Sequence, residues 1–314
     1  MHEFDVIARY FSWDTIATDK VVLGVGDDAA VLDVPADKQL VTSIDTFISG
    51  VHFPEDTSAQ AIGHKALAVN LSDLAAMGAN PAWFTLALTM PEINNDWLKG
   101  FSSGLQSLAQ HYGVLLVGGD TTRGPLSISI QVMGLVDKGK ALLRSGANVG
   151  DKIYVTGTLG DAAAGLQTIL GKLTLAQTDQ QLCQQQLHQP QPRLRESQAI
   201  REFASSCIDI SDGLLQDLSH ILSASEVGAK LDTKDIPFSA ALKTLKQAQA
   251  LQFALSGGDD YQLLFTIPAE KEALFLKVLQ ADMHCIGVIT NDKNTIIDQH
   301  DQLLTAIGYN HFHE

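Results

Sequence analysis

The sequence predicts a mixed α/β protein of about two domains. Its 314 residues are roughly twice the usual size of one domain. Strand-like and helix-like segments alternate along the chain, which is typical of folds in which helices cover sheets. Hydrophobic residues make up 45% and charged residues 18% of the chain, the balance of a protein that buries cores. We therefore expect a compact fold rather than a disordered chain.

Apolar patterning predicts both element types in the first half of the chain. The strands expected there are 21–23, 40–44, 83–90, 114–117 and 126–132, the last of which alternates apolar and polar residues. Helices are expected over 61–79 and 95–111. In the first helix, Asp73 recurs with Ile62, Ala66, Val69 and Ala76 at steps of three and four, so this aspartate lies on the apolar face.

Glycines and basic residues interrupt the apolar pattern between 137 and 150, where we expect the domain boundary. This gives domains 1–137 and 138–314. In the second, a strand is expected over 152–156, a helix after the glycine-rich turn 157–161, and a surface helix and connection over the glutamine-rich stretch 177–191. The clearest helix covers 213–223, with Ser211 or Asp212 as candidate N-cap.

The charge balance and the cysteines exclude several classes of protein. Twenty-one Lys and Arg against 36 Asp and Glu give a net charge of −15, which disfavours a nucleic-acid partner. No apolar run approaches the roughly 18–20 residues of a membrane span, and residues 1–5 lack a signal-peptide pattern, so we expect no membrane partner and a cytoplasmic location. Cys183, Cys207 and Cys285 have neither disulfide nor zinc-site spacing, and we expect buried or surface thiols.

Aspartates gather in glycine-bearing or strand-end contexts in five segments: 24–30, 43–46, 70–73, 118–122 and 208–213. Taken singly, Asp27 and Asp28 could form a turn, Asp45 and Asp120 could cap strands, and Asp212 could cap its helix. Together they are too many for the nearby Lys and Arg residues to neutralise, which favours a bound cation. Ligands that are all oxygen indicate Mg²⁺, and carboxylate-held Mg²⁺ most often serves phosphates. Phosphoryl transfer is therefore the expected chemistry, although no P-loop, protein-kinase or GxGxxG signature is present.

Read together, these segments resemble the thiamine-monophosphate kinase family, in the superfamily of aminoimidazole ribonucleotide synthetase and selenophosphate synthetase. The resemblance covers nearly the whole chain. Its motifs are GVGDDAAV at 24–31, Asp45-Thr46, GVHF at 50–53, HKALAVNLSDLAAMGA at 64–79, GGDTT at 118–122, Arg144, VTGTLG at 155–160, His188 with Pro190, Pro192 and Arg193, DISDGL at 209–214, and GGDDY at 257–261.

The resemblance implies a fold, an activity and a set of ligands. The fold would be α/β (α+β type), a two-domain PurM-like architecture. Its N-terminal sheet domain would bind ATP and Mg²⁺ and form a homodimer, and its C-terminal α/β domain would complete the active site, with the nucleotide near the junction. The activity would be ATP-dependent phosphorylation of thiamine monophosphate to thiamine diphosphate, with several Mg²⁺ ions and ATP as co-substrate.

The resemblance also implies roles for individual residues. The metal set would be Asp28, Ser43, Ile44, Asp45, Asp73, Asp120, Asp209 and Asp212, with Asp27 adjacent and Asp120, Asp209 and Asp212 the most critical. Nucleotide contacts would be Gly119, Asp120, Arg144 and Ser211, and substrate contacts His52, Asp259 and either Tyr309 or Phe312.

The chain departs from the family at three positions. The family commonly has Thr at the position of Ile44, so only the Ile44 carbonyl could coordinate. It usually has Glu at the positions of Asp259 and Gln262, which leaves the substrate contact there open.

We expect direct in-line attack by a phosphate oxygen of thiamine monophosphate on the γ-phosphorus of ATP. That oxygen is largely ionised near neutral pH, so no general base is required. His52 is then a binding residue, or a histidine packed beside Phe53, and Lys65 is expected on a solvated helix face. Three alternatives remain open: a covalent phosphoenzyme, a sister ATP-using synthetase, and an acidic protein that binds cations without turnover.

Overall fold

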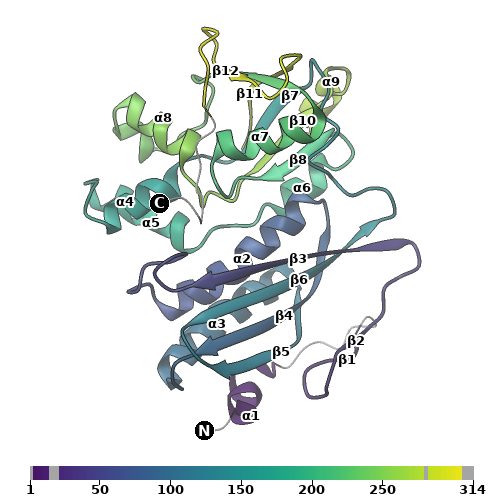
Figure 1. Cartoon of the computed structure of the whole chain (residues 1–314), viewed down its shortest axis with the longest axis vertical. Coiled ribbons are helices and arrows are strands. Elements are labelled where there is room, and N and C mark those ends of the chain that lie inside the picture. The colour runs from purple at the N-terminus through teal and green to yellow at the C-terminus, as the bar shows by residue number, and fades with distance from the viewer. Residues whose placement is uncertain (1–2, 14–20, 279–281, 306–314) are drawn as a thin grey trace. The chain divides into compact units, whose positions relative to one another are not determined.

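The computed structural model describes residues 3–13, 21–278 and 282–305, which belong to two compact units (Figure 1). The first unit comprises Met1–Leu74 and Ala79–Lys140, and the second Ala75–Gly78 and Ala141–Glu314. Within the described ranges, none of the helices combines the length and the apolar character needed to cross a bilayer.

The first unit is a four-stranded sheet with two long helices on one face (Figure 1). Its elements are α1 (Glu3–Val6), η1 (Ile7–Phe11), β1 (Val21–Leu23), β2 (Val31–Leu32), β3 (Lys38–Ile48), α2 (Ala59–Ala76), β4 (Asn80–Met90), α3 (Asn95–Tyr112), β5 (Leu115–Arg123) and β6 (Ser127–Asp137). The strand order is β3-β6-β4-β5, with β4 and β5 parallel and the other pairs antiparallel. Strands β1 and β2 form a separate hairpin.

The strands of this sheet are longer than the sequence predicts. Strand β3 pairs with β6 along its whole length, from Lys38 opposite Asp137 to Ile48 opposite Ser127. Because this ladder satisfies backbone groups beyond the apolar run, the strand continues through Asp45 and Thr46. Strand β5 likewise continues through the GGDTT motif. The expectation that Asp45 and Asp120 lie at strand ends is therefore wrong, and both are inside strands.

Glycines allow α2 and α3 to pack closely. A Cβ atom added at Gly104 of α3 would lie 2.0 Å from the Gln60 carbonyl oxygen of α2, and one at Gly63 of α2 would lie 2.1 Å from the Phe101 carbonyl oxygen of α3. Helix α3 begins at Asn94, whose side chain accepts hydrogen bonds from the backbone N–H groups of Asp96 and Trp97. The close packing of α2 against α3 fixes the position of α2, and with it the position of Asp73, relative to α3.

The second unit is a six-stranded mixed sheet with helices on both faces. Its elements are β7 (Lys152–Thr156), α4 (Asp161–Ile169), α5 (Gln177–His188), α6 (Leu194–Ile200), β8 (Ser206–Asp209), α7 (Leu214–Ser225), β9 (Gly228–Leu231), η2 (Leu242–Thr244), α8 (Gln247–Ser256), β10 (Leu263–Ile267), α9 (Ala269–Val278), β11 (Met283–Thr290) and β12 (Ile296–Ile297). The strand order is β12-β9-β11-β7-β10-β8, and all pairs but β12 with β9 are antiparallel.

Each face of this sheet has its own core. On one face, the apolar stripe of α7, which includes Leu214, Leu218 and Ile221, packs with Val155 and Leu264 of the strands. On the other, Phe275 of α9 makes edge contacts with Tyr154 of β7 and Phe265 of β10. The central strands β7 and β10 are buried on both sides, and the short segments that leave them are consequently held in place.

We expect Gly104→Ala to lower the free energy of unfolding by about 2 kcal/mol or more. The added methyl group would collide with the α2 backbone, and such overpacking outweighs the roughly 1 kcal/mol that alanine contributes to helix propensity. Urea unfolding measures the difference, with Ser103→Ala on the exposed face of the same helix as control. A Gly104→Ala variant as stable as the wild type would contradict the close packing.

Candidate functional site

In the first unit, β3 and α2 bring Ser43, Asp45 and Asp73 to the same side of the sheet. Ser43 and Asp45 are two residues apart in β3 and therefore share its helix-covered face. The Ser43 hydroxyl donates a hydrogen bond of 2.5 Å to Oδ2 of Asp73. As the helical spacing predicts, Asp73 faces the packed side of α2. The three residues supply hydroxyl and carboxylate oxygens at one place.

The two carboxylates of this group interact unfavourably. Burial, and next the negative charge of Asp73, raise the pKa of Asp45 to about 6. Two carboxylates that oppose each other's ionisation, beside a serine hydroxyl, are the donor set of a hard cation such as Mg²⁺. Within the described ranges, no group of three or more His, Cys, Asp or Glu side chains has an arrangement that could hold a metal ion by itself. Any ion here would therefore need further oxygen ligands.

Asp120 lies at the opposite edge of the same sheet. Strands β3 and β5 are separated by β6 and β4, and three steps of about 4.8 Å amount to roughly 14 Å. Asp120 is exposed and follows Gly119, where an added Cβ atom would lie 1.9 Å from the Leu86 carbonyl oxygen. Only glycine fits there. Asp120 and Asp45 are thus too far apart to ligate the same ion directly.

The remaining predicted residues of the first unit differ in their surroundings. Asp28 is exposed in the loop between β1 and β2, and its N–H donates to the Asp27 carboxylate. Ile44 has a side chain that is 62% exposed on the face opposite Ser43 and Asp45, so the residue could offer an ion only its carbonyl. His52 accepts a hydrogen bond from the Ile48 N–H through Nδ1 and lies against Phe47. Lys65 is 4% exposed, so the expected solvated helix face is wrong for this residue.

In the second unit, the predicted residues Asp209, Ser211 and Asp212 occupy the turn from β8 into α7. Asp209 is the last residue of β8 and is buried. The N-cap of α7 is Gly213, with no side-chain capping bond, so the expectation of Ser211 or Asp212 at this position is wrong. Asp217, inside the helix, instead binds the backbone that precedes the helix. Its Oδ2 accepts from the N–H groups of Ser211, Asp212 and Gly213, each at 3.1 Å.

The segment before β10 is bonded to this turn through the backbone. The Asp259 N–H donates to the Ser211 carbonyl, and the Tyr261 N–H to the Ile210 carbonyl, both at 2.8 Å. Asp259 and Tyr261 have φ values of 69° and 48°, and such left-handed backbone in non-glycine residues is concentrated at functional sites. The Tyr261 hydroxyl donates to the Asp259 carboxylate. The backbone conformation and this bond together orient the Asp259 side chain.

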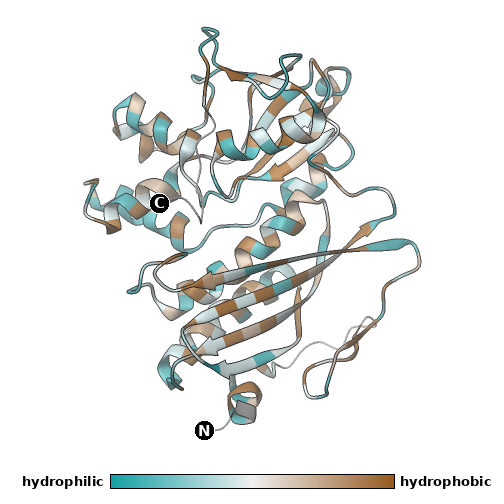
Figure 2. Ribbon diagram, in the orientation of Figure 1, coloured by the Kyte–Doolittle hydropathy of each residue, from teal (hydrophilic) through white to brown (hydrophobic). Residues whose placement is uncertain are grey.

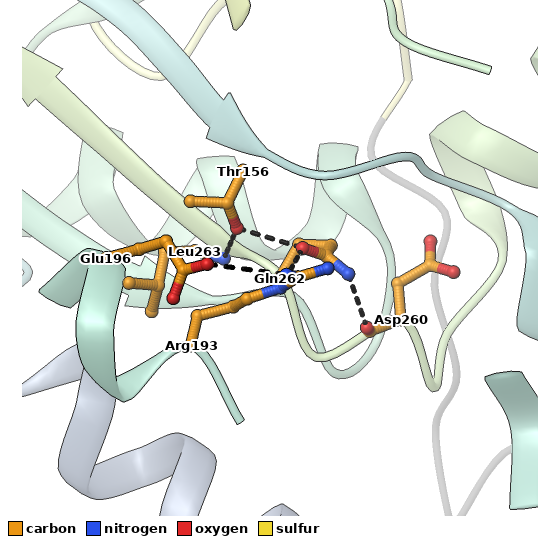
Figure 3. Close-up of polar contacts among 6 residues, drawn as sticks. All are labelled: Thr156, Arg193, Glu196, Asp260, Gln262 and Leu263. Carbon is orange, nitrogen blue, oxygen red and sulfur yellow. Dashed lines mark hydrogen bonds and ion pairs between the residues drawn. The ribbon is translucent and has the colours of Figure 1, made fainter. Parts of the chain in front are cut away.

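Gln262, one of the departures from the family pattern, is buried in a polar network (Figure 3). Its Oε1 accepts from Thr156 Oγ1 at 2.9 Å and from Arg193 Nε at 2.7 Å, and its Nε2 donates to the Asp260 carbonyl. Arg193 also contacts Glu196. Gln262 therefore links β7, β10 and the segment before α6.

The other predicted residues are less informative. Arg144 is exposed, and its carbonyl accepts a hydrogen bond from Ser225. Tyr309 and Phe312 lie outside the described residues. Cys183 and Cys207 are buried and Cys285 is exposed, all with free thiols, as the spacing predicts.

Sequence reasoning assigned no individual role to Asp161, Asp217 or Asp260, which are among the buried aspartates of the second unit. Asp161 accepts from the hydroxyls of Thr158 and Ser239, and Asp260 accepts from the Gly160 N–H. Burial raises the pKa of Asp217 to about 7, assisted by the charge of Asp212 and opposed by the three N–H donors. A signal for Asp217 was present: it lies on the apolar stripe of α7 between Leu214 and Leu218.

Asp45→Asn should raise stability at pH 7.5 in the presence of EDTA. The pKa of Asp45 is higher in the folded chain than the usual 3.8, so ionisation of Asp45 destabilises the folded state increasingly as the pH rises above about 4, and fully above about 6. One pKa unit corresponds to about 1.4 kcal/mol, which limits the gain to about 3 kcal/mol. The gain should shrink as the pH falls from about 6 toward 4.

Urea unfolding at pH 7.5 and 4.5 measures this difference, with the exposed Asp33→Asn as control. A variant that is less stable than the wild type at pH 7.5 would argue against the charge repulsion between Asp45 and Asp73.

Comparisons with known proteins cover the whole chain. Residues 26–136 match the family described as AIR synthase related protein, N-terminal domain, and residues 148–299 match its C-terminal domain. The chain is 46% identical to the thiamine-monophosphate kinase of Escherichia coli K12, with 99% of this chain and 98% of that protein covered.

Solved structures agree with these matches. The crystal structure of thiamine-monophosphate kinase from Stenotrophomonas maltophilia K279a is similar with a TM-score of 0.86 and 43% identity, covering 96% of each chain. A structure of AaThiL complexed with AMPPCP and TMP is similar with a TM-score of 0.80 and 29% identity, covering 98% of this chain and 96% of that one. With its two AIR synthase-related domains and 46% identity over nearly its full length, the chain belongs to the thiamine-monophosphate kinase family of enzymes.

Proposed function

We propose that the protein transfers the γ-phosphoryl group of ATP to thiamine monophosphate, giving thiamine diphosphate and ADP. The observation that carries this proposal is the identity of 46% to a thiamine-monophosphate kinase over 99% of the chain. The solved complex of a relative with AMPPCP and TMP supports the same pair of ligands. The oxygen-rich aspartate groups of both units are suited to such substrates if they hold Mg²⁺, because both substrates are polyanions that bind through divalent cations.

We assign Mg²⁺ binding to the aspartates of both units. In the first unit the ligands would be Ser43, Asp45 and Asp73, with Asp28, Asp120 and the Ile44 carbonyl, and in the second Asp209 and Asp212. The separation of roughly 14 Å between the strands of Asp45 and Asp120 favours more than one ion. Bound Mg²⁺ ions would neutralise phosphate oxygens of both substrates and the charge that develops on the transferred group.

The remaining contacts are assigned to residues on the same motifs. Gly119, Asp120, Arg144 and Ser211 would contact the nucleotide. The bare backbone at Gly119 supports this role, because a phosphate can approach it closely. His52 and Asp259 would bind thiamine monophosphate, together with Tyr309 or Phe312. The Nδ1 atom of His52 accepts a hydrogen bond from the Ile48 N–H, which orients the imidazole ring.

The transfer we propose is direct and in line. A terminal phosphate oxygen of thiamine monophosphate forms a bond to the γ-phosphorus while the bond from that phosphorus to the β,γ-bridging oxygen breaks, and ADP leaves. The attacking oxygen is already ionised, since the second pKa of a phosphate monoester is about 6, so the chain needs no general base. The aspartates are engaged as ligands, which disfavours a covalent phosphoenzyme.

We also propose that the protein is a homodimer formed by the sheet of the first unit. The face of β3 opposite α2 carries the exposed side chains of Ile44 and Ile48, and hydrophobic residues recur along the strands of this sheet in Figure 2. Apolar side chains on an uncovered sheet face favour association with a second copy. Sedimentation of the purified chain would measure the oligomeric state.

Purified protein incubated with ATP, Mg²⁺ and thiamine monophosphate should form thiamine diphosphate, measured by chromatography. EDTA should abolish product formation, and unphosphorylated thiamine should give none, because an ionised phosphate oxygen is the proposed nucleophile. Without acceptor, labelled ATP should leave no label on the protein.

Folded protein that binds ATP but forms no product would favour a sister ATP-using synthetase. Cation binding that is indifferent to ATP would favour a metal-binding protein without turnover.

Asp120→Asn and Asp209→Asn should each lower kcat/KM for thiamine monophosphate by at least about 100-fold, because each removes charge from a proposed ion site. Circular dichroism should show that the fold is retained. Asp33→Asn provides the control for loss of an exposed carboxylate outside the proposed set. Near-normal activity in both active-site variants would refute the metal assignment.

A further inference from the structure

The carboxylate of Asp217 holds the backbone of the turn from β8 into α7. It lies in the first turn of α7, is 2% exposed, and accepts from three consecutive N–H groups through a single oxygen. These donors belong to Ser211, Asp212 and Gly213, the residues that follow Asp209. No side chain caps the helix at Gly213, and Asp217 instead satisfies the N–H groups of this N-cap residue and of the two residues before it.

The same turn is fixed from its other side by the segment before β10. The carbonyls of Ile210 and Ser211 accept from Tyr261 and Asp259, and the Ile210 N–H donates to the Gln262 carbonyl at 2.7 Å. Both donor and acceptor groups of the turn are therefore paired within the second unit. Of these bonds, only those to Asp217 depend on a side chain, and they are the ones that a substitution can remove.

We propose that Asp217 is a positioning residue for Mg²⁺ binding by the second unit. It acts through the backbone of Ser211–Gly213, which it keeps in the conformation that presents Asp209 and Asp212 to a cation. The inference rests on the proposed function, in which these two residues are metal ligands. A carboxylate oxygen is suited to this task, because one side chain can accept from three consecutive N–H groups at once. Ligand geometry set by such supporting bonds typically affects metal affinity by 10- to 100-fold.

Two variants of Asp217 separate its role as an acceptor from its charge. Asp217→Ala removes the acceptor, and the Mg²⁺ concentration for half-maximal activity should rise at least about tenfold. Asp217→Asn keeps an oxygen in nearly the same place, so the Mg²⁺ concentration for half-maximal activity should stay within about threefold of the wild-type value. A Mg²⁺ titration of the melting temperature in the presence of a non-hydrolysable ATP analogue gives a second measure of binding that needs no turnover.

Asp151 provides a matched control in the same unit. It is 5% exposed and accepts from the Asn148 N–H and the Ser205 hydroxyl, away from the turn and the proposed ligands. Asp151→Ala should lower the melting temperature while leaving the Mg²⁺ requirement unchanged. If Asp217→Ala and Asp151→Ala show the same Mg²⁺ requirement, Asp217 is merely structural and the proposal is overturned.

Hydrogen exchange tests the contact without activity. In the wild type the N–H groups of Ser211, Asp212 and Gly213 should exchange slowly, and in Asp217→Ala at least about tenfold faster. Fast exchange of all three in the wild type would overturn the proposal. Should Asp217→Ala fail to fold, Asp217→Asn decides: a Mg²⁺ requirement near that of the wild type supports the acceptor role, and a rise of tenfold or more refutes it.

Failure of the proposed function has a different signature. The wild type would then form no thiamine diphosphate, and no Mg²⁺ requirement of turnover could be measured for any variant. The hydrogen exchange and the Mg²⁺-dependent melting temperature would still report on Asp217.

Discussion

Repulsion among closely placed carboxylates is the interaction on which the candidate site depends. Asp45 and Asp73 share one side of a sheet, and Asp217 lies beside Asp212, in a chain of net charge −15. In both pairs burial and the neighbouring charge raise a pKa, so the fold retains carboxylates whose ionisation it disfavours. A divalent cation would relieve this repulsion in the first pair, and three N–H groups already offset it at Asp217. The first pair thus weakens the fold when both carboxylates are ionised.

The rest of each unit keeps these groups in position through close backbone contacts. In the first unit, the glycines between α2 and α3 bring two helices together and so orient Asp73 toward β3. In the second, the turn after β8 is bonded to the segment before β10, and Asp259 lies in the left-handed region. Gln262, a departure from the family pattern, is accommodated by hydrogen bonds within the second unit. Its amide accepts from Thr156 and Arg193, so this side chain is used in the fold and contributes no charge to a ligand.

Much of the fold could be predicted from periodicity. The strands Val21–Leu23 and Lys152–Thr156 have the predicted bounds, and the helix with the clearest apolar stripe became α7. Strand lengths could not be predicted, because pairing with a neighbour extends a strand beyond its apolar run, as β6 does for β3. The N-cap of α7 was predicted wrongly for a related reason. Local sequence favours Ser211 or Asp212, whereas in the fold the backbone N–H groups of both residues bond to the carboxylate of Asp217 and Gly213 becomes the N-cap.

The sequence by itself determined which residues could carry the chemistry. The chain has more aspartates next to glycines than its nearby Lys and Arg side chains can neutralise, which indicated Mg²⁺ and phosphate. The order of these motifs along the chain indicated the family that the comparisons identify. Only the tertiary structure decided which of these residues lie together. Strand order separates Asp120 from Asp45 by two intervening strands, while α2, packed on the sheet, brings Asp73 to Ser43. The physical reason is that composition and spacing fix local backbone preferences and charge, whereas distances between segments follow from which strands pair and which faces are buried together.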